Sequence, residues 1–463
     1  MPQLTRLILN GGSRHRLSKG FLLRNAMGTE KEWGCTCRFL EIAGRSLLQD
    51  RELERFQVSG TEKHPGMITL ITPFMAVFTF EHREEFCRLL AKSIAVLNEA
   101  VKPSHHLLGI GLEPFAAVEN GNPPDLCADL HQIEVLDEDE IERIYNLFRQ
   151  YLPELIAITS NSPLRNGKVQ GDFSQRMRLN ASSFLPHYIS QFTASRLDQI
   201  KRMMRKDHGL GDLRQMDINP LGEKTDLPEL ETRELLDDFA PAIELRFSDA
   251  QCSLPFLRAV IILLQAIAIQ GRALTRRGGR VPYMQHQVID SNKARAIQRG
   301  LTALFQPDPK FSNPKDPGSR YHKRPTDEQA PERARGSLLN LLETSLLPSL
   351  HSLGCRGPEL LPLVLGLELR RRGRQCLANY AEYQQFLAHK RATTLDNALI
   401  EDWKLLLTYP GRDLMTEKNR AIYPAISSEI EQMWEEKLLR SHHAFGTGTE
   451  GRTQSGKGDE HGN

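Results

Sequence analysis

The order of strand-like and helix-like segments constrains the fold of this chain most. The stretch "GMITLITPFMAVFTF" (66–80) reads as extended, and "REEFCRLLAKSIAVLNEAV" (83–101) has the spacing of an amphipathic helix. Another helix is expected at "DEDEIERIYNLFRQYL" (137–152), and a cleanly alternating strand at "IELRFSDA" (243–250). Strands predominate early and helices late, without the regular alternation of a parallel sheet. The pattern predicts an α+β fold with an antiparallel sheet and flanking helices.

The charge balance and the apolar runs exclude some functions. Lysine plus arginine (60) nearly equal aspartate plus glutamate (58), so no global field favours nucleic acid or a membrane surface. The longest apolar run, Ala259 to Ile269, is too short to span a bilayer and predicts a buried core helix. Seven scattered cysteines without a C-x-x-C pair fit reduced thiols. We expect a cytoplasmic protein that binds small molecules, with a homo-oligomer possible.

Composition also divides the chain. No acidic residue precedes Glu30, whereas several basic residues do, which predicts a basic leader over 1–24 or, less favoured, an organelle transit peptide. One domain is expected over 25–445. Within it, the proline- and charge-rich residues 306–335 predict a long surface loop. Residues 446–463 are poor in apolar side chains and predict a disordered tail.

Three segments would carry charge on one strand face. Side chains alternate between faces in a strand, so "GTEKEWG" (28–34) would present Glu30 and Glu32 together. The strand at 243–250 would likewise present Glu244 with Arg246. A third strand, "DFSQRMRL" (172–179), would present Ser174, Arg176 and Arg178. Carboxylates that hold Mg²⁺ beside arginines that neutralise phosphate are what phosphoryl transfer needs, so these faces predict a phosphoryl-transfer surface.

Other motifs favour structural interpretations. The G-x-G-x-x-G at Gly446 follows no strand and opens no helix, and the chain contains no G-x-x-x-x-G-K-[ST] loop, so ATP would bind without a P-loop. His105 and His106 are interpreted mainly as hydrogen-bonded strand residues. The C-x-C pair, Cys35 and Cys37, is interpreted as packing.

Four stretches resemble the glutamate-cysteine ligase type 2 and carboxylate-amine ligase family. They are "GTEKEWG", "ITSNSPLRNGKVQGDFSQRMR", "IELRFSDAQ" and "NKARAIQRGL", which occur in the family's order between about residues 25 and 300. The resemblance implies a catalytic fold related to glutamine synthetase. It also implies an ATP- and Mg²⁺-dependent reaction, in which a carboxylate becomes an acyl phosphate and an amine then forms the amide. Glutamate and cysteine are the best-known substrates.

The resemblance also assigns residues. It implies Mg²⁺ on Glu30, Glu32 and Glu244, with Arg176 and Arg246 as catalytic arginines on phosphate or substrate carboxylate. The family has an acidic residue in the strand before a T-P step, and this chain has Thr69 there. Glu81 is the candidate replacement for that acid. Asn219 stands where the family has arginine. The implied substrate and ATP contacts are Asn161, Ser162, Ser174, Arg178 and Glu113, of which Glu113 occupies a position usually held by histidine.

Three functions remain open from the sequence. The leading hypothesis is an ATP-dependent carboxylate-amine ligase of the glutamate-cysteine ligase kind. The second is a related ligase with another acid or amine. The third is a catalytically silent binding protein, which Thr69 and Asn219 favour.

Overall fold

The structure is a computed structural model of the 463-residue chain. It describes residues 13–25, 33–61, 64–101, 105–112, 126–135, 138–165, 167–179, 188–189, 199, 202, 216–219, 242–307, 332–390 and 412–446.

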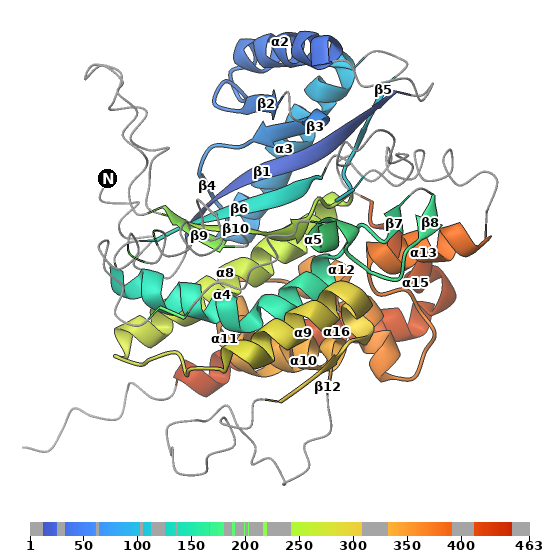
Figure 1. Ribbon diagram of the computed structural model, residues 1–463. Coiled ribbons are helices and arrows are strands. Elements are labelled where there is room, and N and C mark those ends of the chain that lie inside the picture. The colour runs from blue at the N-terminus through green and yellow to red at the C-terminus, as the bar shows by residue number, and fades with distance from the viewer. Residues whose placement is uncertain are drawn as a thin grey trace, which may run out of the picture.

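An eight-stranded antiparallel sheet forms the upper half of the molecule in Figure 1. Its main path runs β2-β3-β1-β6-β10-β9, and β4 and β5 also pair with β1. The strands are β1 (Arg14–Asn25), β2 (Gln57–Thr61), β3 (His64–Ile71), β4 (Met75–Ala76), β5 (His105–Leu108), β6 (Ala128–Glu134), β9 (Met216–Asn219) and β10 (Ala242–Asp249). Two two-stranded sheets complete the strands: β7 (Leu164–Arg165) with β8 (Lys168–Val169), and β11 (Leu304–Phe305) with β12 (Glu332–Arg333).

One face of the sheet is apolar because alternate residues on neighbouring strands are buried. Phe21 of β1 lies opposite Ile68 of β3, and both belong to a hydrophobic cluster with Leu17 and Leu70. The same cluster includes residues of α2 (Trp33–Gln49), of α3 (Phe80–Ala100) and of the first turns of α8 (Leu254–Arg276). These helices therefore cover this half of the sheet. At the other half, Ile133 and Leu245 join a larger cluster with α4 (Glu138–Thr159) and the rest of α8.

Helix α8 is the central core element. Ser253 caps its N-terminus by accepting a hydrogen bond from the amide of Phe256, and proline stands in the first turn. Its residues from Val260 to Ala268 are all buried. The helix is long and apolar enough to cross a membrane by length and composition alone, but 89% of its most apolar window is buried inside the protein. A core helix of a globular protein has the same properties.

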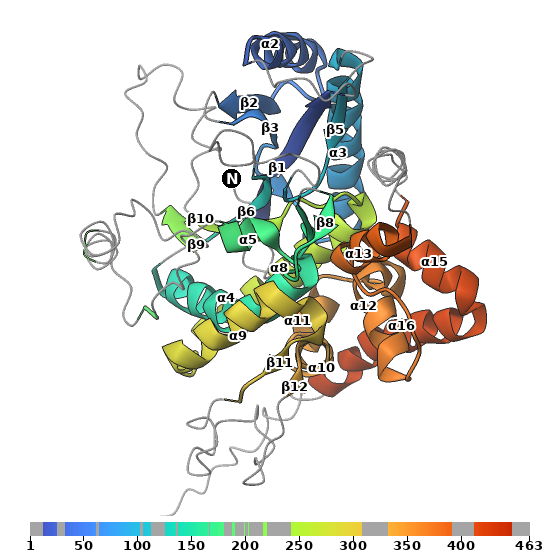
Figure 2. The same cartoon turned by 45° about the vertical axis from the view of Figure 1, so that its right-hand side comes forward.

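The remaining helices gather below and beside α8 (Figures 1 and 2). They are α9 (His286–Arg299), α10 (Ala334–Asn340), α11 (Leu347–Ser352), α12 (Gly357–Arg371), α13 (Tyr380–Lys390), α15 (Leu414–Ile422) and α16 (Pro424–Gly446), with short turns at Gly300–Thr302 and Leu341–Ser345. A buried ion pair joins the two parts of the fold, because both Arg83 of α3 and Glu359 of α12 are 1% exposed and form two contacts of 2.8 Å.

The predicted α+β class is confirmed: the structure combines an antiparallel sheet with flanking helices. The predicted boundary between a leader and a domain is wrong. Residues 14–24, which were expected in a basic leader, form most of β1, the strand with the most partners in the sheet. Leu17 and Phe21 are buried on one face of β1, whereas Arg14 and Arg16 lie on the other face. Lys19 shares the buried face and forms an ion pair with Asp129.

One predicted strand lies mostly outside the described residues, and another is corrected. Of the stretch Met27 to Cys35, residues 27–32 lie outside the described residues, and Trp33 begins α2. The strand predicted at 172–179 is the short helix α5 (Gln175–Leu179), so Ser174, Arg176 and Arg178 do not share a strand face. Most of the predicted loop (308–331) and of the predicted tail (447–463) lies outside the described residues. Of the loop's last residues, Glu332 and Arg333 form β12, and Ala334 begins α10.

Candidate functional site on the open face of the sheet

The second face of the sheet, which we call the open face, carries half-buried polar side chains. Strand β1 contributes Arg14, Arg16 and Ser18, because these alternate with the buried His15, Leu17 and Lys19. The register aligns one residue from each of four strands. Arg16 lies opposite Gln132 of β6, Gln132 opposite Glu244 of β10, and Glu244 opposite Asp217 of β9. The row therefore runs from a cation through an amide to two carboxylates.

The acidic end of this row is internally connected. Gln132 Nε2 donates to Glu244 Oε2 at 2.7 Å, and the Nε of Arg246 contacts Glu244 Oε1. Arg246 Nη2 also lies 3.9 Å from Asp217 Oδ2, so one guanidinium lies between two carboxylates of adjacent strands. The Arg246 side chain remains 32% exposed, whereas Glu244 is 13% exposed. Arg246 can therefore reach solvent and a ligand while it offsets the repulsion between the two acids.

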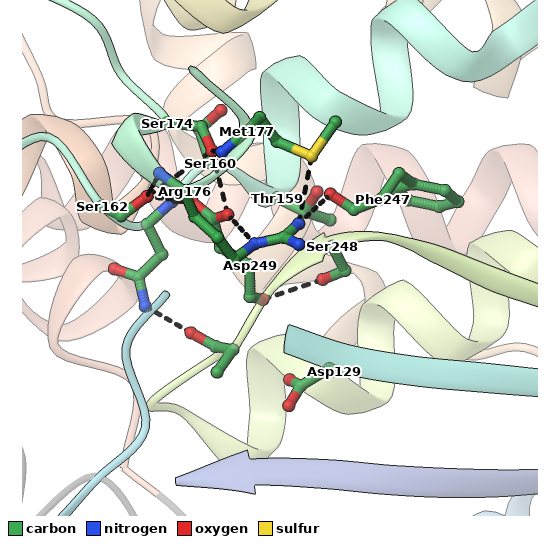
Figure 3. Close-up of polar contacts among 12 residues, drawn as sticks. Asp129, Thr159, Ser160, Ser162, Ser174, Arg176, Met177, Phe247, Ser248 and Asp249 are labelled. Atoms are coloured by element: carbon green, nitrogen blue, oxygen red, sulfur yellow. Dashed lines mark hydrogen bonds and ion pairs between the residues drawn. The ribbon is translucent and has the colours of Figure 1, made fainter. Parts of the chain in front are cut away.

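A second cluster, the Asp249 cluster, lies where β10 ends (Figure 3). Asp249 Oδ2 accepts from the Asn161 amide at 2.8 Å and from Ser162 Oγ at 2.7 Å. Its Oδ1 accepts from Ser174 Oγ at 2.9 Å and from Arg176 Nε at 2.7 Å. All five residues are buried, so the carboxylate has exchanged its water shell for four hydrogen bonds.

Arg176 fixes the end of β10 as well as the charge of Asp249. Its Nη2 donates to the carbonyl of Phe247 at 2.7 Å and lies 3.4 Å from the carbonyl of Arg246. These carbonyls belong to the irregularity between Leu245 and Ser248, where the register with β6 shifts. A guanidinium committed to these contacts holds the backbone next to Arg246. Gly111 lets the cluster pack, since a Cβ there would lie 2.7 Å from Asp249 Cγ.

A buried ion pair lies one strand away. Lys19 Nζ is 2.7 Å from Asp129 Oδ1, and both side chains are fully buried. Asp129 Oδ2 accepts from the amide of Gln251, whose side chain donates to the carbonyl of Asp249 at 2.7 Å. Burial raises the pKa of Asp129, and the nearby Lys19 opposes that rise. Gln251 thus links Asp129 to Asp249.

The structure brings the sequence-predicted residues into two groups. Asn161, Ser162, Ser174 and Arg176 meet at Asp249, whereas Glu244 and Arg246 lie on the open face. Arg178 is 72% exposed, 4.0 Å from Asp172. Glu30, Glu32 and Glu113 lie outside the described residues.

Glu81 does not join the open face. It lies in the first turn of α3, the helix that packs on the apolar face, and its side chain is 76% exposed near Arg356. The structure therefore does not support Glu81 as a replacement for the acid missing at Thr69. Its proximity to Thr69 in sequence is lost because the chain leaves the sheet at β4 and turns into a helix.

The comparison with known families matches residues 120–309 of this chain to Glutamate-cysteine ligase family 2. These residues include β6, α4, α5, β9, β10, α8 and α9. They therefore supply the acidic end of the row and every residue that bonds to Asp249. The match covers less than half of the chain, and over these residues the chain is similar to that family. The stretch "GTEKEWG", on which part of the resemblance rests, lies before this segment.

A relative in this family agrees with the match. A protein of Gloeobacter violaceus named "Putative glutamate--cysteine ligase 2" is 28% identical over 170 residues, which are 36% of this chain and 41% of that protein. Among solved structures, a bifunctional glutathione synthetase from Pasteurella multocida aligns with 94% of this chain and 54% of its own, at 13% identity and a TM-score of 0.47. A glutamate-cysteine ligase from Francisella tularensis aligns with 94% and 98%, at 12% identity and a TM-score of 0.49. Both likenesses are too weak to identify a fold family.

Sequence reasoning missed three residues of the family segment. Asp249 is the last acid of the stretch "IELRFSDAQ", but strand alternation alone does not predict a role for it. Asp217 and Gln132 could be recognised only from the register, because β9 and β6 are separated from β10 by many residues. Single-strand periodicity identifies a face but does not say which strands are neighbours.

The open face supplies only part of a metal site. Glu244 and Asp217 offer carboxylates of the kind that Mg²⁺ prefers. However, in the part of the chain that the structure describes, no group of three or more His, Cys, Asp or Glu residues could hold a metal ion. Arg246, moreover, already offsets the charge of Glu244. The described residues therefore do not form a complete Mg²⁺ site.

Proposed function

We propose that this protein is an ATP-dependent carboxylate-amine ligase whose reaction surface is the open face. ATP would phosphorylate a substrate carboxylate, and an amine would displace phosphate from the acyl phosphate to form an amide. A glutamate-like acid and cysteine are the substrates that the family favours, and a glutamine synthetase-like catalytic fold is part of this proposal. The match of residues 120–309 to the family carries it, because that segment builds both polar clusters.

The contacts around Arg246 support a role in the reaction. An arginine between two acids, with a third of its side chain exposed, can turn one guanidinium edge toward a transferring phosphate or a carboxylate. In this proposal Arg246 binds the charge that develops between the phosphate and the acid, and Glu244 orients it. Arg176 has the different role of holding the β10 backbone through Asp249 and Phe247.

The proposed reaction also uses Mg²⁺. Glu244 is its candidate ligand among the described residues, while Glu30 and Glu32 remain predicted ligands on sequence grounds. Mg²⁺ would neutralise phosphate charge.

The test is ADP release, measured with Mg²⁺, ATP and a panel of amino acids. We expect amine-dependent ADP formation by the parent, and a loss of about a hundredfold in Arg246→Lys, since lysine keeps the charge but lacks the planar two-point contact. Arg277→Lys is the matched control, because Arg277 is an exposed arginine within the matched residues, directly after α8. No ADP release with any acid and amine pair would contradict the ligase proposal.

A catalytically silent binding protein is the second candidate. Strands β1 and β3 favour it, because neither contributes a carboxylate to the open face. Their residues on that face include Arg16, Ser18 and Thr69. Such a protein would still bind nucleotide or acid through Arg246. An increase in melting temperature with MgATP, together with no turnover across the amino-acid panel, would support this candidate.

A further inference from the structure

A pocket of about 220 Å³ lies between α2, the end of α3 and the strands β1 and β5. Helix α2 stands at the top of the molecule in Figures 1 and 2, above the sheet. The apolar part of the lining consists of Leu23, Phe39, Ile42, Ala100 and Val101. Leu23 and Phe39 belong to the hydrophobic cluster on the apolar face of the sheet, and Ala100 and Val101 pack against that cluster. The pocket is therefore separate from the open face.

The polar part of the lining is basic. It comes from Arg38 of α2 and from His105 at the start of β5, and none of the lining residues is acidic. Arg38 is exposed, and within the described part of the chain it forms no hydrogen bond or ion pair. Glu41, the acid nearest to it along α2, contacts Arg45 instead. An exposed guanidinium that lines a mostly apolar pocket favours a ligand with an anionic group, which it can hold by two parallel hydrogen bonds.

The volume sets the size of the apolar part of such a ligand. A protein cavity of about 150 Å³ holds benzene, which has six non-hydrogen atoms, so by proportion 220 Å³ holds about nine. A carboxylate with about eight carbons has this size. It would bury its alkyl chain against the apolar lining and leave its charge near solvent.

We propose that this pocket binds a medium-chain carboxylate, with the alkyl chain against Phe39 and Ile42 and the carboxylate on Arg38. The proposal goes beyond the proposed function, because the residues that it uses lie on the side of the sheet opposite Glu244 and Arg246.

Calorimetric titration of the full chain with octanoate, without ATP or Mg²⁺, tests this proposal. We expect saturable binding of one octanoate per chain with a Kd of roughly 1 mM or tighter. Butyrate carries the same charge on a chain that is shorter by four methylene groups, so it should bind at least about a hundredfold more weakly. This comparison tests the use of the apolar lining.

Two variants test the position of the ligand. Arg38→Gln removes the charge that would hold the carboxylate and should weaken octanoate binding by roughly tenfold. Arg51→Gln, which removes an exposed arginine just after α2, is its matched control and should bind as the parent does.

Ala100→Leu fills the pocket from the end of α3 and should also weaken octanoate binding by roughly tenfold or more, because the added carbons occupy the space of the alkyl chain. Ala95→Leu, at an exposed position of the same helix, is its matched control. Melting curves establish that each variant is folded. If Ala100→Leu does not fold, Ile42→Trp fills the pocket from α2 instead.

Any of four results would overturn the proposal: no saturable octanoate binding by the parent, equal affinity for butyrate, unchanged octanoate affinity in Arg38→Gln or in the folded filling variant, or equal losses in the control variants. Losses confined to Arg38→Gln and the filling variant would support it. None of these measurements involves turnover, so their outcome is independent of whether ADP release is found.

Discussion

The carboxylate of Asp249 accepts four hydrogen bonds from two segments of the chain, and one of them comes from a buried guanidinium. Removing one partner of such a pair leaves the other charge buried without its counter-ion. At this residue, electrostatics and backbone geometry are coupled, because Arg176 also holds the Phe247 carbonyl. A substitution of Asp249 should therefore mainly lower stability. Through Arg176 it should also affect the β10 backbone at the open face.

We expect Asp249→Asn to lower the free energy of unfolding by about 3 to 5 kcal/mol, the usual cost of breaking a buried ion pair on one side. Urea unfolding followed by circular dichroism measures it. Arg178→Gln, in the same helix as Arg176 but exposed, should change stability by less than about 0.5 kcal/mol. A loss below about 1 kcal/mol in Asp249→Asn would contradict the prediction.

At the scale of elements, strands β1 and β6 carry a pH-dependent contact on their apolar side. His15 Nε2 lies 3.0 Å from His131 Nδ1, and both rings are fully buried. One ring must donate and the other accept, so the accepting imidazole must be neutral. Burial lowers the pKa of His15 from 6.5 to about 3 and lowers that of His131 well below 6.5.

The sign of the effect follows from these pKa values. Between about pH 3 and 6.5 the unfolded chain binds protons that the folded chain does not, so stability falls as the pH falls below 6.5. Each histidine contributes a slope of about 1.4 kcal/mol per pH unit. We expect His15→Gln/His131→Gln to flatten the dependence of the urea midpoint on pH in this range. An unchanged slope in the double variant would contradict this.

At the contact between α4 and α10, a buried carboxyl group should make stability fall as the pH rises, opposite to the effect of the two histidines. Burial raises the pKa of Glu154 from 4.5 to about 7, although Ser337 Oγ donates to its carboxylate at 2.7 Å. Between about pH 4.5 and 7 the folded chain holds a proton that the unfolded chain has released, so this residue costs stability as the pH rises. Glu154→Gln should raise the melting temperature at about pH 8 and have little effect at about pH 4. Equal shifts at both pH values would exclude titration of Glu154 as the cause.

Some of the secondary-structure elements could be predicted from the sequence and others could not. The strand at β10 and the helices α3, α4 and α8 were predictable, because each has a long and regular apolar period. Helix α5 was not, since five residues are too few to distinguish one helical turn from an alternating strand. The pairing of β10 with β6 and β9 depends on register between distant segments. For that reason the sequence predicted Glu244 and Arg246 as a pair, but not their neighbours Asp217 and Gln132.

For the whole molecule, the ion pair between Arg83 and Glu359 joins the N-terminal and C-terminal parts. Arg83 Nη1 also donates to the Leu353 carbonyl at 3.0 Å, so the guanidinium spans the contact between α3 and the loop before α12. Helix α8 adds a second connection, because its first turns belong to one hydrophobic cluster and the rest to the other. Both features favour unfolding of the two parts together.

We expect Glu359→Gln to reduce stability by about 3 kcal/mol or more and to broaden unfolding, since a buried guanidinium loses its counter-ion at the junction. In a Trp33→Phe/Trp403→Phe background, fluorescence of Trp434, buried in α16, follows the C-terminal part. Far-UV circular dichroism follows the whole chain. Arg88→Gln in α3, whose ion pairs are exposed, is the control. A variant with the stability of the parent and coincident curves would show that the junction does not depend on this pair.

The central position of β1 has a consequence for biosynthesis. Its partners β3, β4, β5 and β6 lie between residues 64 and 134, so a ribosome must complete more than a hundred further residues before β1 can pair fully. During that interval Leu17, Phe21, Leu22 and Leu23 are covered only in part, although all four are buried in the finished fold. Synthesis adds about 5 to 20 residues per second, so the interval lasts several seconds. The nascent chain should depend on chaperones during this period, and slower translation should increase its aggregation.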